Sequence, residues 1–488
     1  MTDLCELSVC ELSRRIRAGE MSAVEVTESF LARAHDKQPE LNAFITLHDE
    51  GALERARALD SAAGKARSKM RLFGVPIAVK DNICVSGSLT TCGSRILGSF
   101  LCPYDATVTE RIISAGAIII GKTNLDEFAM GSSTETSFFG ITRNPCDLER
   151  SPGGSSGGSA ASVAAGCAPC ALGTDTGGSV RQPASFCGVV GVKPTYGRVS
   201  RYGLVAFAPS FDQIGPLTMN VKDAALLLEV IAGYDARDST SVSCPVPEYH
   251  NLLDRDVSGV KIGVIKEHVE GETSPVVKET LQDALRCLER IGAEIVPISL
   301  PHLNYVVAVY YILCTAETSS NLLRYDGVRY GFRASSYCDL IDMYRKTREK
   351  GFGQEVKRRI ALGTFVLSTG YYDAYYLKAQ KARTLIIREL NEAFDKVDFL
   401  IGPTSPQQAF KIGEKADDPL MMYLSDIFTI PANLAGLPAI SIPYGPRDGR
   451  LPVGLQLIAK PFDEAGMFQL ASAIEKVNCG SPRGKRFA

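Results

Sequence analysis

The sequence predicts an α/β protein whose largely parallel or mixed β-sheet is covered by helices on both faces. From Leu72 onward, short β-branched runs alternate with segments of helical period and with Gly/Pro turns. Several of these runs are apolar throughout, as expected of strands buried on both faces. The composition agrees, because 45% apolar and 22% charged residues are typical of globular chains.

The first sixty residues have the pattern of helices. Ser8 and Ser22 each stand three residues before a glutamate, which is the spacing of a capping box, and Gly19 stands where the first helix would end. Beyond them, strands are expected at 75–79, 117–120, near Ala171, and at 260–265, 295–298, 399–401, 439–442 and 455–458. Helices are expected at 221–232, 275–291, 381–394 and 464–477. Without a long linker or repeat, one domain over 1–488 is predicted, with an N-terminal helical layer at 1–65.

The charge and the apolar runs exclude several classes of protein. The formal net charge is −2 and no long Lys/Arg block occurs. These features argue against a chain that binds nucleic acid by itself through electrostatic attraction. The N-terminus is acidic where a signal peptide would be basic, and no 18 consecutive apolar residues occur. We therefore expect a soluble cytoplasmic protein that does not contact a membrane.

The 14 cysteines are scattered singly, and a chain of this length needs no disulfides, so we expect reduced thiols in small apolar sites. Cys167 and Cys170 have the Cys-x-x-Cys spacing of a redox pair or of half a zinc site. No second such pair follows, and the surrounding residues are small and apolar. The sequence therefore favours a structural role for this pair and predicts no metal.

The segment from Gly116 to Thr123 matches the Walker A expression, with Gly121 before Lys122. A phosphate-binding loop is a flexible turn after a strand, whereas residues 117–120 themselves have the pattern of a strand. Gly116 is expected to end a helix and Lys122 to follow the strand. Nucleotide binding is therefore not predicted here.

Two Gly-Ser clusters occur at 151–162 and 173–183, and Ser179 in the second follows Ser155 in the first by 24 residues. A Gly/Ser segment is usually a flexible linker, but here it leads directly into a small-residue helix and a strand. Glycines at such a turn let backbone N–H groups approach a ligand closely. One helix and one strand are enough to return the chain to the same sheet edge, so the two turns are expected to meet. A serine hydroxyl there would have free N–H groups beside it for an oxyanion hole.

A serine nucleophile needs a base, and histidine is the usual one. The chain has only five histidines, in polar or helical-surface contexts without a partner pattern, so a Ser-His-Asp triad stays possible but unsupported. Lys80 instead ends an apolar strand. A lysine held there is driven toward its neutral form, and a pKa of about 7.5 in place of about 10.4 corresponds to roughly 4 kcal/mol. Neutral lysine is a competent base, although an exposed strand-end lysine is the alternative.

The segment at 305–376 is helix-rich and crowded with tyrosines. Tyrosine combines a rigid apolar face with a polar tip, so this segment is expected to lie near the substrate pocket. Ordinary aromatic packing between helices is the alternative for any single tyrosine.

Lys80 and the two motifs Gly153-Gly-Ser-Ser-Gly-Gly158 and Asp175-Thr-Gly-Gly-Ser179 together resemble the amidase signature family, whose fold is one mixed sheet wrapped by helices. The resemblance implies Ser179 as the acyl-forming nucleophile, Ser155 as a bridging serine with a cis peptide bond, and Lys80 as the base. It also implies an oxyanion hole made by the N–H groups of Thr176, Gly177, Gly178 and Ser179, where one donor is worth about 3 kcal/mol in other systems.

Further motifs, including 131–137, 196–207, 325–331 and 355–360, are similar to the branch of A subunits of glutamyl-tRNA(Gln) amidotransferases. That resemblance implies hydrolysis of glutamine, with Tyr310, Arg359 and Asp426 as the binding residues. Their neighbours Tyr311 and Arg358 are the alternatives in register. A zwitterion needs a cation for its carboxylate and an anion for its ammonium.

The same resemblance implies partners. A B subunit would use ATP and magnesium to amidate misacylated Glu-tRNA(Gln), or also Asp-tRNA(Asn), with the ammonia released here, and a small C subunit would complete a heterotrimer. No cofactor is expected in this chain, and charged tRNA would be met through the complex. The competing hypotheses are a free-standing amidase for small amides and a non-catalytic scaffold.

Overall fold

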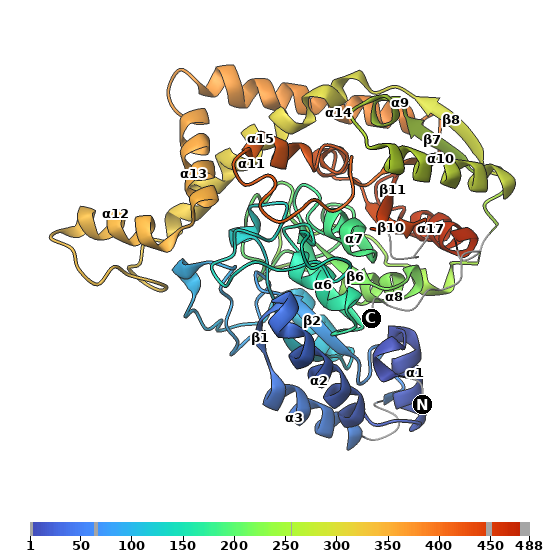
Figure 1. Cartoon of the computed structure of the whole chain (residues 1–488), viewed down its shortest axis with the longest axis horizontal. Helices are drawn as coiled ribbons and strands as arrows, with labels where there is room; N and C mark the ends of the chain where they lie inside the picture. The colour runs from blue at the N-terminus through green and yellow to red at the C-terminus, as the bar shows by residue number, and fades with distance from the viewer. Residues whose placement is uncertain (1–2, 63–66, 255, 446–450, 479–488) are drawn as a thin grey trace.

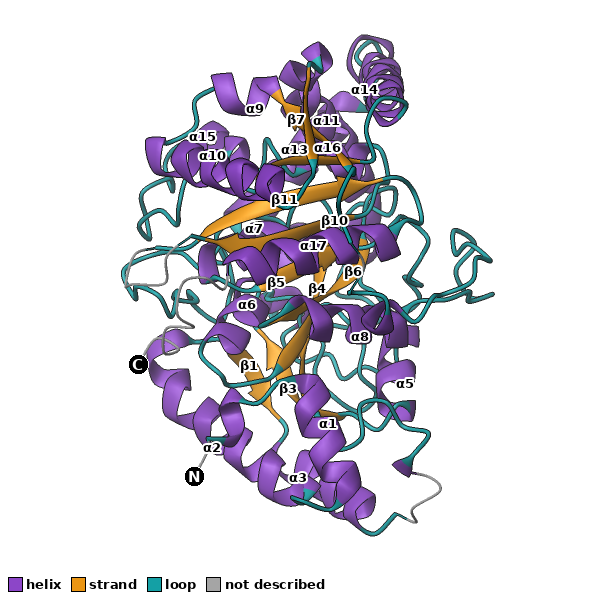
Figure 2. Ribbon diagram, turned by 90° about the vertical axis from the view of Figure 1, so that its right-hand side faces the viewer, coloured by secondary structure: helices purple, strands orange, loops and turns teal. Residues whose placement is uncertain are grey.

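The computed structural model describes residues 3–62, 67–254, 256–445 and 451–478. One 11-stranded mixed sheet runs through it in the order β1-β3-β2-β4-β6-β5-β10-β11-β9-β7-β8 (Figures 1 and 2). The sheet is parallel at β3-β2-β4 and at β9-β7-β8, and antiparallel elsewhere. The predicted fold class is therefore confirmed. The strands are β1 (Phe44–Leu47), β2 (Pro76–Lys80), β3 (Ile118–Thr123), β4 (Cys170–Asp175), β5 (Val190–Lys193), β6 (Gln213–Thr218), β7 (Lys261–Ile265), β8 (Glu294–Ile298), β9 (Phe399–Pro403), β10 (Ala439–Tyr444) and β11 (Val453–Ala459).

Helices cover both faces of the sheet (Figure 2). Because successive side chains of a strand point to opposite faces, β9 divides its residues between two cores. Phe399 and Ile401 pack in a core with α1, α2, α8 and α17, whereas Leu400 packs in a core with α11, α14 and α16. The helices are α1 (Val9–Ala18), α2 (Ala23–Leu41), α3 (Asp49–Asp60), α5 (Thr107–Ser114), α6 (Gly157–Ala164), α7 (Arg181–Cys187), α8 (Val221–Ile231), α9 (Lys266–Glu270), α10 (Pro275–Arg290), α11 (Val306–Asn321), α12 (Leu340–Gly351), α13 (Gln354–Val366), α14 (Lys378–Phe394), α15 (Pro419–Leu424), α16 (Ile430–Leu434) and α17 (Glu464–Asn478).

The local signals at the N-terminus act as predicted. The side chain of Ser8 accepts a hydrogen bond from the N–H of Glu11, and that of Ser22 accepts one from Glu25. Gly19 ends α1 with φ of 76°, a left-handed conformation that favours glycine. Each of these caps satisfies an N–H or C=O group that the helix itself leaves unpaired.

Three strands were not expected. β1 interrupts the N-terminal helical layer and pairs with β3 at the sheet edge, while β5 and β6 lie in the middle of the sheet. Gly215 and Pro216 inside β6 resemble a turn in the sequence, yet the strand is buried between β4 and β5. Sheet pairing here overrides the local preference of the residues.

Three side chains lie where the sequence did not place them. Lys122 does not follow the strand but is part of β3, where its buried ammonium pairs with Asp81 at 2.9 Å. Its segment is thus a helix end followed by a strand rather than a phosphate-binding loop. His268 is not polar or at the surface but buried against Phe428, with ring centroids 4.2 Å apart. Cys338 is exposed, unlike the apolar thiols expected.

The segment at 305–376 is helical, as predicted, with α11, α12 and α13 followed by a π-helical turn at Tyr372–Leu377. One stretch, Pro301–Arg324, is long and apolar enough to cross a membrane, but 56% of its most apolar window is buried inside the fold. Buried packing of this kind is what the core helix of a soluble protein shows. α12 lies at the end of an arm that projects from the body of the molecule (Figure 1).

Candidate active site

Lys80 is the last residue of β2, in the interior of the sheet. Its side chain is fully buried, and its Nζ donates to the Oγ of Ser155 at 2.8 Å, the Oγ of Ser156 at 2.8 Å and the Oγ1 of Thr174 at 2.9 Å. Burial lowers the pKa of Lys80 to about 7, although the carboxylates of Asp126 and others raise it. The amine is thus neutral in a large fraction near pH 7. Its three shortest contacts are to hydroxyl groups, and it also donates to the carbonyl of Thr174 at 3.4 Å.

The serine pair occupies a tightly packed turn before α6. The Gly154–Ser155 peptide bond is cis, as the family resemblance implied. Gly154 leaves no room for a side chain, because a Cβ there would lie 2.2 Å from a carboxylate oxygen of Asp126. The Oγ of Ser156 donates to the carbonyl of Thr174 at 3.1 Å. Ser156 is therefore held against the end of β4, and both serines lie beside Lys80.

Ser179 lies in the second Gly-Ser turn, between β4 and α7. Its carbonyl accepts the N–H of Ser156 at 3.1 Å, so the two serine turns meet as predicted. Ser179 is 8% exposed, whereas Ser155 is fully buried. Within the described chain the Oγ of Ser179 makes no hydrogen bond, so this hydroxyl is free to approach a ligand. The contact between the Oγ atoms of Ser155 and Ser179 is not formed here.

The backbone of the same turn is only partly free to bind an oxyanion. The N–H of Gly178 donates to the carboxylate of Asp175 at 2.9 Å and is occupied. The N–H groups of Thr176, Gly177 and Ser179 donate to no atom among the described residues. Three of the four donors expected from the sequence therefore remain available.

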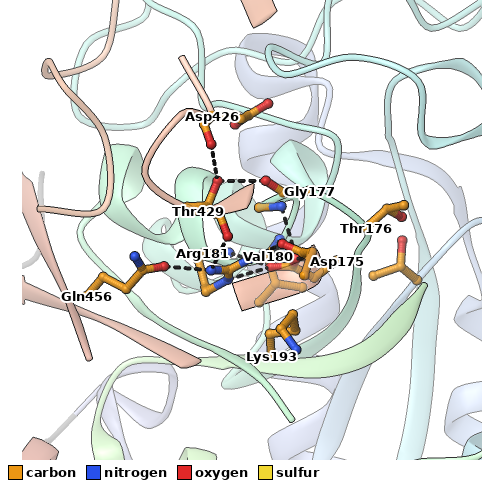
Figure 3. A network of polar contacts seen from close by, with 12 residues as sticks. Asp175, Thr176, Gly177, Val180, Arg181, Lys193, Asp426, Thr429 and Gln456 are labelled. Carbon is orange, nitrogen blue, oxygen red and sulfur yellow. Dashed lines mark hydrogen bonds and ion pairs between the residues drawn. The ribbon is translucent and has the colours of Figure 1, made fainter. Parts of the chain in front are cut away.

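Asp175 and Arg181 fix the shape of this turn (Figure 3). The buried guanidinium donates to both carboxylate oxygens at 3.0 Å, to the carbonyl of Thr429 at 3.0 Å and to Gln456 at 2.6 Å. Burial raises the pKa of Asp175, but the charge and hydrogen bonds of Arg181, together with the hydrogen bond from Asn433, lower that pKa to about 2. Thr429 in turn donates to the carbonyl of Gly177 at 2.6 Å. The turn is thus held rigidly by ionic and neutral bonds.

Arg359 lies on α13 with its side chain only 3% exposed, whereas the neighbouring Arg358 is 36% exposed. The Nε of Arg359 donates to Glu355 at 2.8 Å, and the guanidinium lies between aromatic rings, including that of Tyr311 at 5.2 Å. The Nη atoms donate to no atom in the part of the chain that is described. Of the two adjacent arginines, Arg359 is therefore the one available inside the fold.

Asp426 and Tyr310 lie near the turn that carries Ser179. The Oδ2 of Asp426 accepts the hydroxyl of Ser132, while its Oδ1 is buried without a partner in the described residues. Burial raises the pKa of Asp426 to about 7, although Ser132 and Arg359 lower it. A Cβ on Gly177 would lie 2.7 Å from the Tyr310 hydroxyl, which places this ring directly against the turn. Arg359 and Asp426 both act electrostatically on Tyr310. The fold thus brings the three residues together.

Among the described residues, neither a histidine base beside the two serines nor a cluster of metal ligands is found. His35, His48, His250 and His302 bond other side chains, and none of the five histidines bonds Ser155 or Ser179 in the described chain. No group of three or more His, Cys, Asp or Glu residues there is arranged to hold a metal ion. Cys167 and Cys170 are free and buried, and burial raises the pKa of both thiols.

Sequence reasoning did not single out Ser156, Glu355 or Arg181. Ser156 contacts Lys80 as closely as Ser155 does, and its only signal was its place within the first Gly-Ser cluster. Glu355 and Arg181 became relevant through contacts alone. Their only local signals were that Arg181 lies within the second Gly-Ser cluster and Glu355 within the motif at 355–360.

The chain matches the family described as Amidase over residues 25–468. It is 56% identical to the A subunit of the glutamyl-tRNA(Gln) amidotransferase of Persephonella marina, over 97% of this chain and 98% of that protein. The solved structure of the corresponding A subunit from Thermotoga maritima is 46% identical, with a TM-score of 0.81 over 100% of this chain and 97% of that one. The peptide amidase in complex with the inhibitor chymostatin gives a TM-score of 0.84 at 33% identity, over 98% of both chains. Backbone similarity alone therefore does not separate these two kinds of protein, whereas sequence identity does.

Proposed function

This chain belongs to the amidase family, and on that premise we propose that it is the glutamine-hydrolysing A subunit of a glutamyl-tRNA(Gln) amidotransferase. The geometric observation that carries the proposal is the buried Lys80, bonded to Ser155 at 2.8 Å beside the turn of Ser179. The high identity to A subunits selects this branch over other amidases. We also propose that the chain acts as one domain, since a single sheet extends through it.

The first half of the reaction forms an ester. The Oγ of Ser179 attacks the side-chain amide carbon of glutamine, and its proton passes through Ser155 to the neutral amine of Lys80. The N–H groups of Thr176, Gly177 and Ser179 stabilise the oxyanion, which is an electrostatic contribution that needs no rearrangement of the turn. The C–N bond then breaks as the proton returns to the leaving nitrogen, and ammonia departs. For this relay the Ser179 side chain must come within hydrogen-bonding reach of Ser155 when substrate is bound.

The second half releases glutamate. Water replaces ammonia, gives a proton to Lys80 through the same serine, and its oxygen attacks the ester carbon. The bond between that carbon and the Oγ of Ser179 breaks, and the serine recovers its proton. Lys80 thus acts as base and then as acid in each half, which requires a pKa near the working pH.

Three buried residues bind the amino acid end of the substrate. Arg359 binds the α-carboxylate, and the unpartnered oxygen of Asp426 binds the α-ammonium. Tyr310 forms a wall between this pair and the nucleophile turn. A buried carboxylate with one unsatisfied oxygen is costly unless a cation or donor fills the site, so Asp426 is matched to an ammonium group.

The ammonia is used in a complex with B and C subunits, where the B subunit holds ATP and magnesium and meets the misacylated tRNA. The near-neutral charge of this chain supports that division, because tRNA binding by one chain alone needs a basic surface. Such a complex works in the cytoplasm.

A glutaminase assay tests the proposal. The full-length chain is purified alone and with co-expressed B and C subunits, and ammonia release from glutamine is measured for wild type and Ser179→Ala. We expect the wild-type complex to release ammonia and the variant to lose this activity, while transamidation driven by added ammonium salt persists. A wild type that hydrolyses simple amides but not glutamine would support the free-standing amidase instead. If Ser179→Ala still releases ammonia from glutamine, Ser179 is not the nucleophile.

A further inference from the structure

The environment of Arg359 is unusual for a carboxylate-binding residue. Its guanidinium is enclosed by the rings of Phe207, Tyr311 and Tyr423 at 5.2–5.5 Å. Such rings attract a cation but give no direction in which its N–H groups must point. Aromatic enclosure alone would therefore leave the side-chain torsions of Arg359, and with them the direction of its N–H groups, unfixed.

Glu355, one helical turn before Arg359 on α13, supplies that direction. Its Oε1 accepts the Nε of Arg359 at 2.8 Å and the hydroxyl of Tyr423 at 2.8 Å, and its other oxygen accepts Arg358. The ring of Tyr423 is itself stacked on Tyr311, with centroids 3.8 Å apart and planes at 22°. Glu355 is only 12% exposed, so these bonds form away from bulk water.

Electrostatics agree with this geometry. Burial raises the pKa of Glu355, but the charge and hydrogen bond of Arg359, together with Tyr423 and Arg358, bring the pKa below its ordinary value. The carboxylate is therefore charged at neutral pH. With Nε occupied by Glu355, the four N–H groups on the two Nη atoms are left for a ligand, and this edge of a guanidinium matches a carboxylate in a bidentate manner.

We propose that Glu355, held by Tyr423, is a positioning residue that makes the site specific for amides carrying an α-carboxylate. The inference rests on the proposed function, because it assumes that Arg359 binds that carboxylate. Glu355 itself touches no substrate. Its effect is to fix the guanidinium so that the bidentate geometry exists before the substrate arrives, which reduces the ordering cost of binding.

The simpler explanation is that Glu355 and Arg359 form an ordinary ion pair along α13. Such a pair at i,i+4 stabilises an exposed helix by about 0.3–0.5 kcal/mol and has no reason to affect one substrate more than another. The two explanations differ in substrate dependence, and the experiment compares two substrates for this reason.

The test compares L-glutamine with 4-aminobutanamide, which keeps the amide and the ammonium of glutamine but lacks the α-carboxylate. The variants are Glu355→Ala, Glu355→Gln and Tyr423→Phe in the full-length protein with its B and C subunits. The control is Glu294→Gln. Glu294 begins the edge strand β8, and its exposed side chain pairs with Lys261 of the neighbouring strand β7. Thermal melts establish that each variant folds.

For glutamine we expect Glu355→Ala to raise KM about 10-fold, equivalent to about 1.4 kcal/mol, with kcat changed less than about threefold. Glu355→Gln and Tyr423→Phe keep part of the contact and should give smaller increases. For 4-aminobutanamide, kcat/KM of the Glu355 and Tyr423 variants should stay within about twofold of wild type. Glu294→Gln should leave the kinetics with both substrates unchanged. Equal losses on both substrates, or an unchanged glutamine KM, would overturn the proposal.

Binding separates this result from failure of the proposed function. In a Ser179→Ala background, calorimetry measures the Kd of glutamine with and without Glu355→Ala. If the wild type hydrolyses no glutamine, the proposed glutaminase fails. The present inference then survives only if glutamine still binds and Glu355→Ala weakens that binding, and it is overturned if glutamine does not bind.

Discussion

Replacing Lys80 by methionine tests the base of the proposed reaction most directly. Methionine fills a similar volume without an amine. With its pKa near 7, about nine-tenths of Lys80 is neutral at pH 8, whereas an ordinary pKa of 10.5 would leave only about 0.3% neutral. Burial thus raises the supply of base roughly 300-fold at pH 8. The change in pKa from 10.5 to about 7 corresponds to about 5 kcal/mol between the two protonation states.

The expected result concerns both the rate and its pH dependence. Because the neutral amine is the base, glutaminase kcat of the wild type should rise with pH through about 7 and level off above it. Lys80→Met should lower kcat by about three orders of magnitude and remove this rise, in line with the usual value of a general base. Ammonia release measured from pH 6 to 9 gives both quantities, and ammonium-driven transamidation is the control for intact folding.

Stability offers an independent measurement of the same pKa. The pKa of Lys80 is lower in the folded state than in the unfolded chain, so the unfolded chain binds more protons between about pH 7 and 10.5. The contribution of Lys80 to the free energy of unfolding therefore increases as pH rises through this window. Lys80→Met should remove that increase, as urea denaturation at pH 7 and pH 9.5 would measure. A wild-type rate that does not vary around pH 7, or a variant retaining a tenth of the activity, would refute the reasoning.

Three further variants test the other parts of the site. Burial raises the pKa of Asp426 to about 7, so the KM for glutamine should fall as pH rises through this value. Asp426→Asn should keep KM high and independent of pH. If KM falls with pH in the variant as it does in the wild type, Asp426 is excluded as the anion. Gly177→Ala places a Cβ 2.7 Å from Tyr310 and should lower kcat/KM by about 100-fold or more, measured with glutamine; near-normal activity would mean that the turn can move. Arg181→Lys loses the paired bonds to Asp175 and should lower the free energy of unfolding by about 3–5 kcal/mol in urea titrations, whereas a loss below about 1 kcal/mol would contradict the rigid turn.

The sequence predicted much of the fold because many of its signals are local. The hydroxyls of Ser8 and Ser22 cap the helices that follow them, as their spacing indicated. The apolar runs that became β2, β9 and β11 were recognisable because both faces of these strands are buried. β6 was missed because Gly215 and Pro216 favour a turn, and only pairing with β4 and β5 makes this segment a strand.

The residues of the candidate site also separate into those that local sequence signals indicated and those whose position depends on the tertiary structure. A lysine at the end of an apolar strand and two Gly-Ser turns drew attention to this region, and the family resemblance then implied the roles of Lys80, Ser155 and Ser179. The fold joins the lysine to the first of these serines. His268 and Lys122 were placed wrongly, because the burial of a polar side chain depends on segments far away in the chain.

By itself the sequence therefore determined the kinds of groups present, the order in which they occur, and the elements that carry them. Only the tertiary structure decided that Arg359 rather than Arg358 points inward, that one oxygen of Asp426 has no partner in the described chain, and that Gly178 is not free to bind an oxyanion. The physical reason is that desolvation and bond distance depend on neighbours brought together from separate parts of the chain. Neighbours in sequence mainly set the backbone conformation of a residue, whereas neighbours in space set its protonation state and the atoms that it contacts.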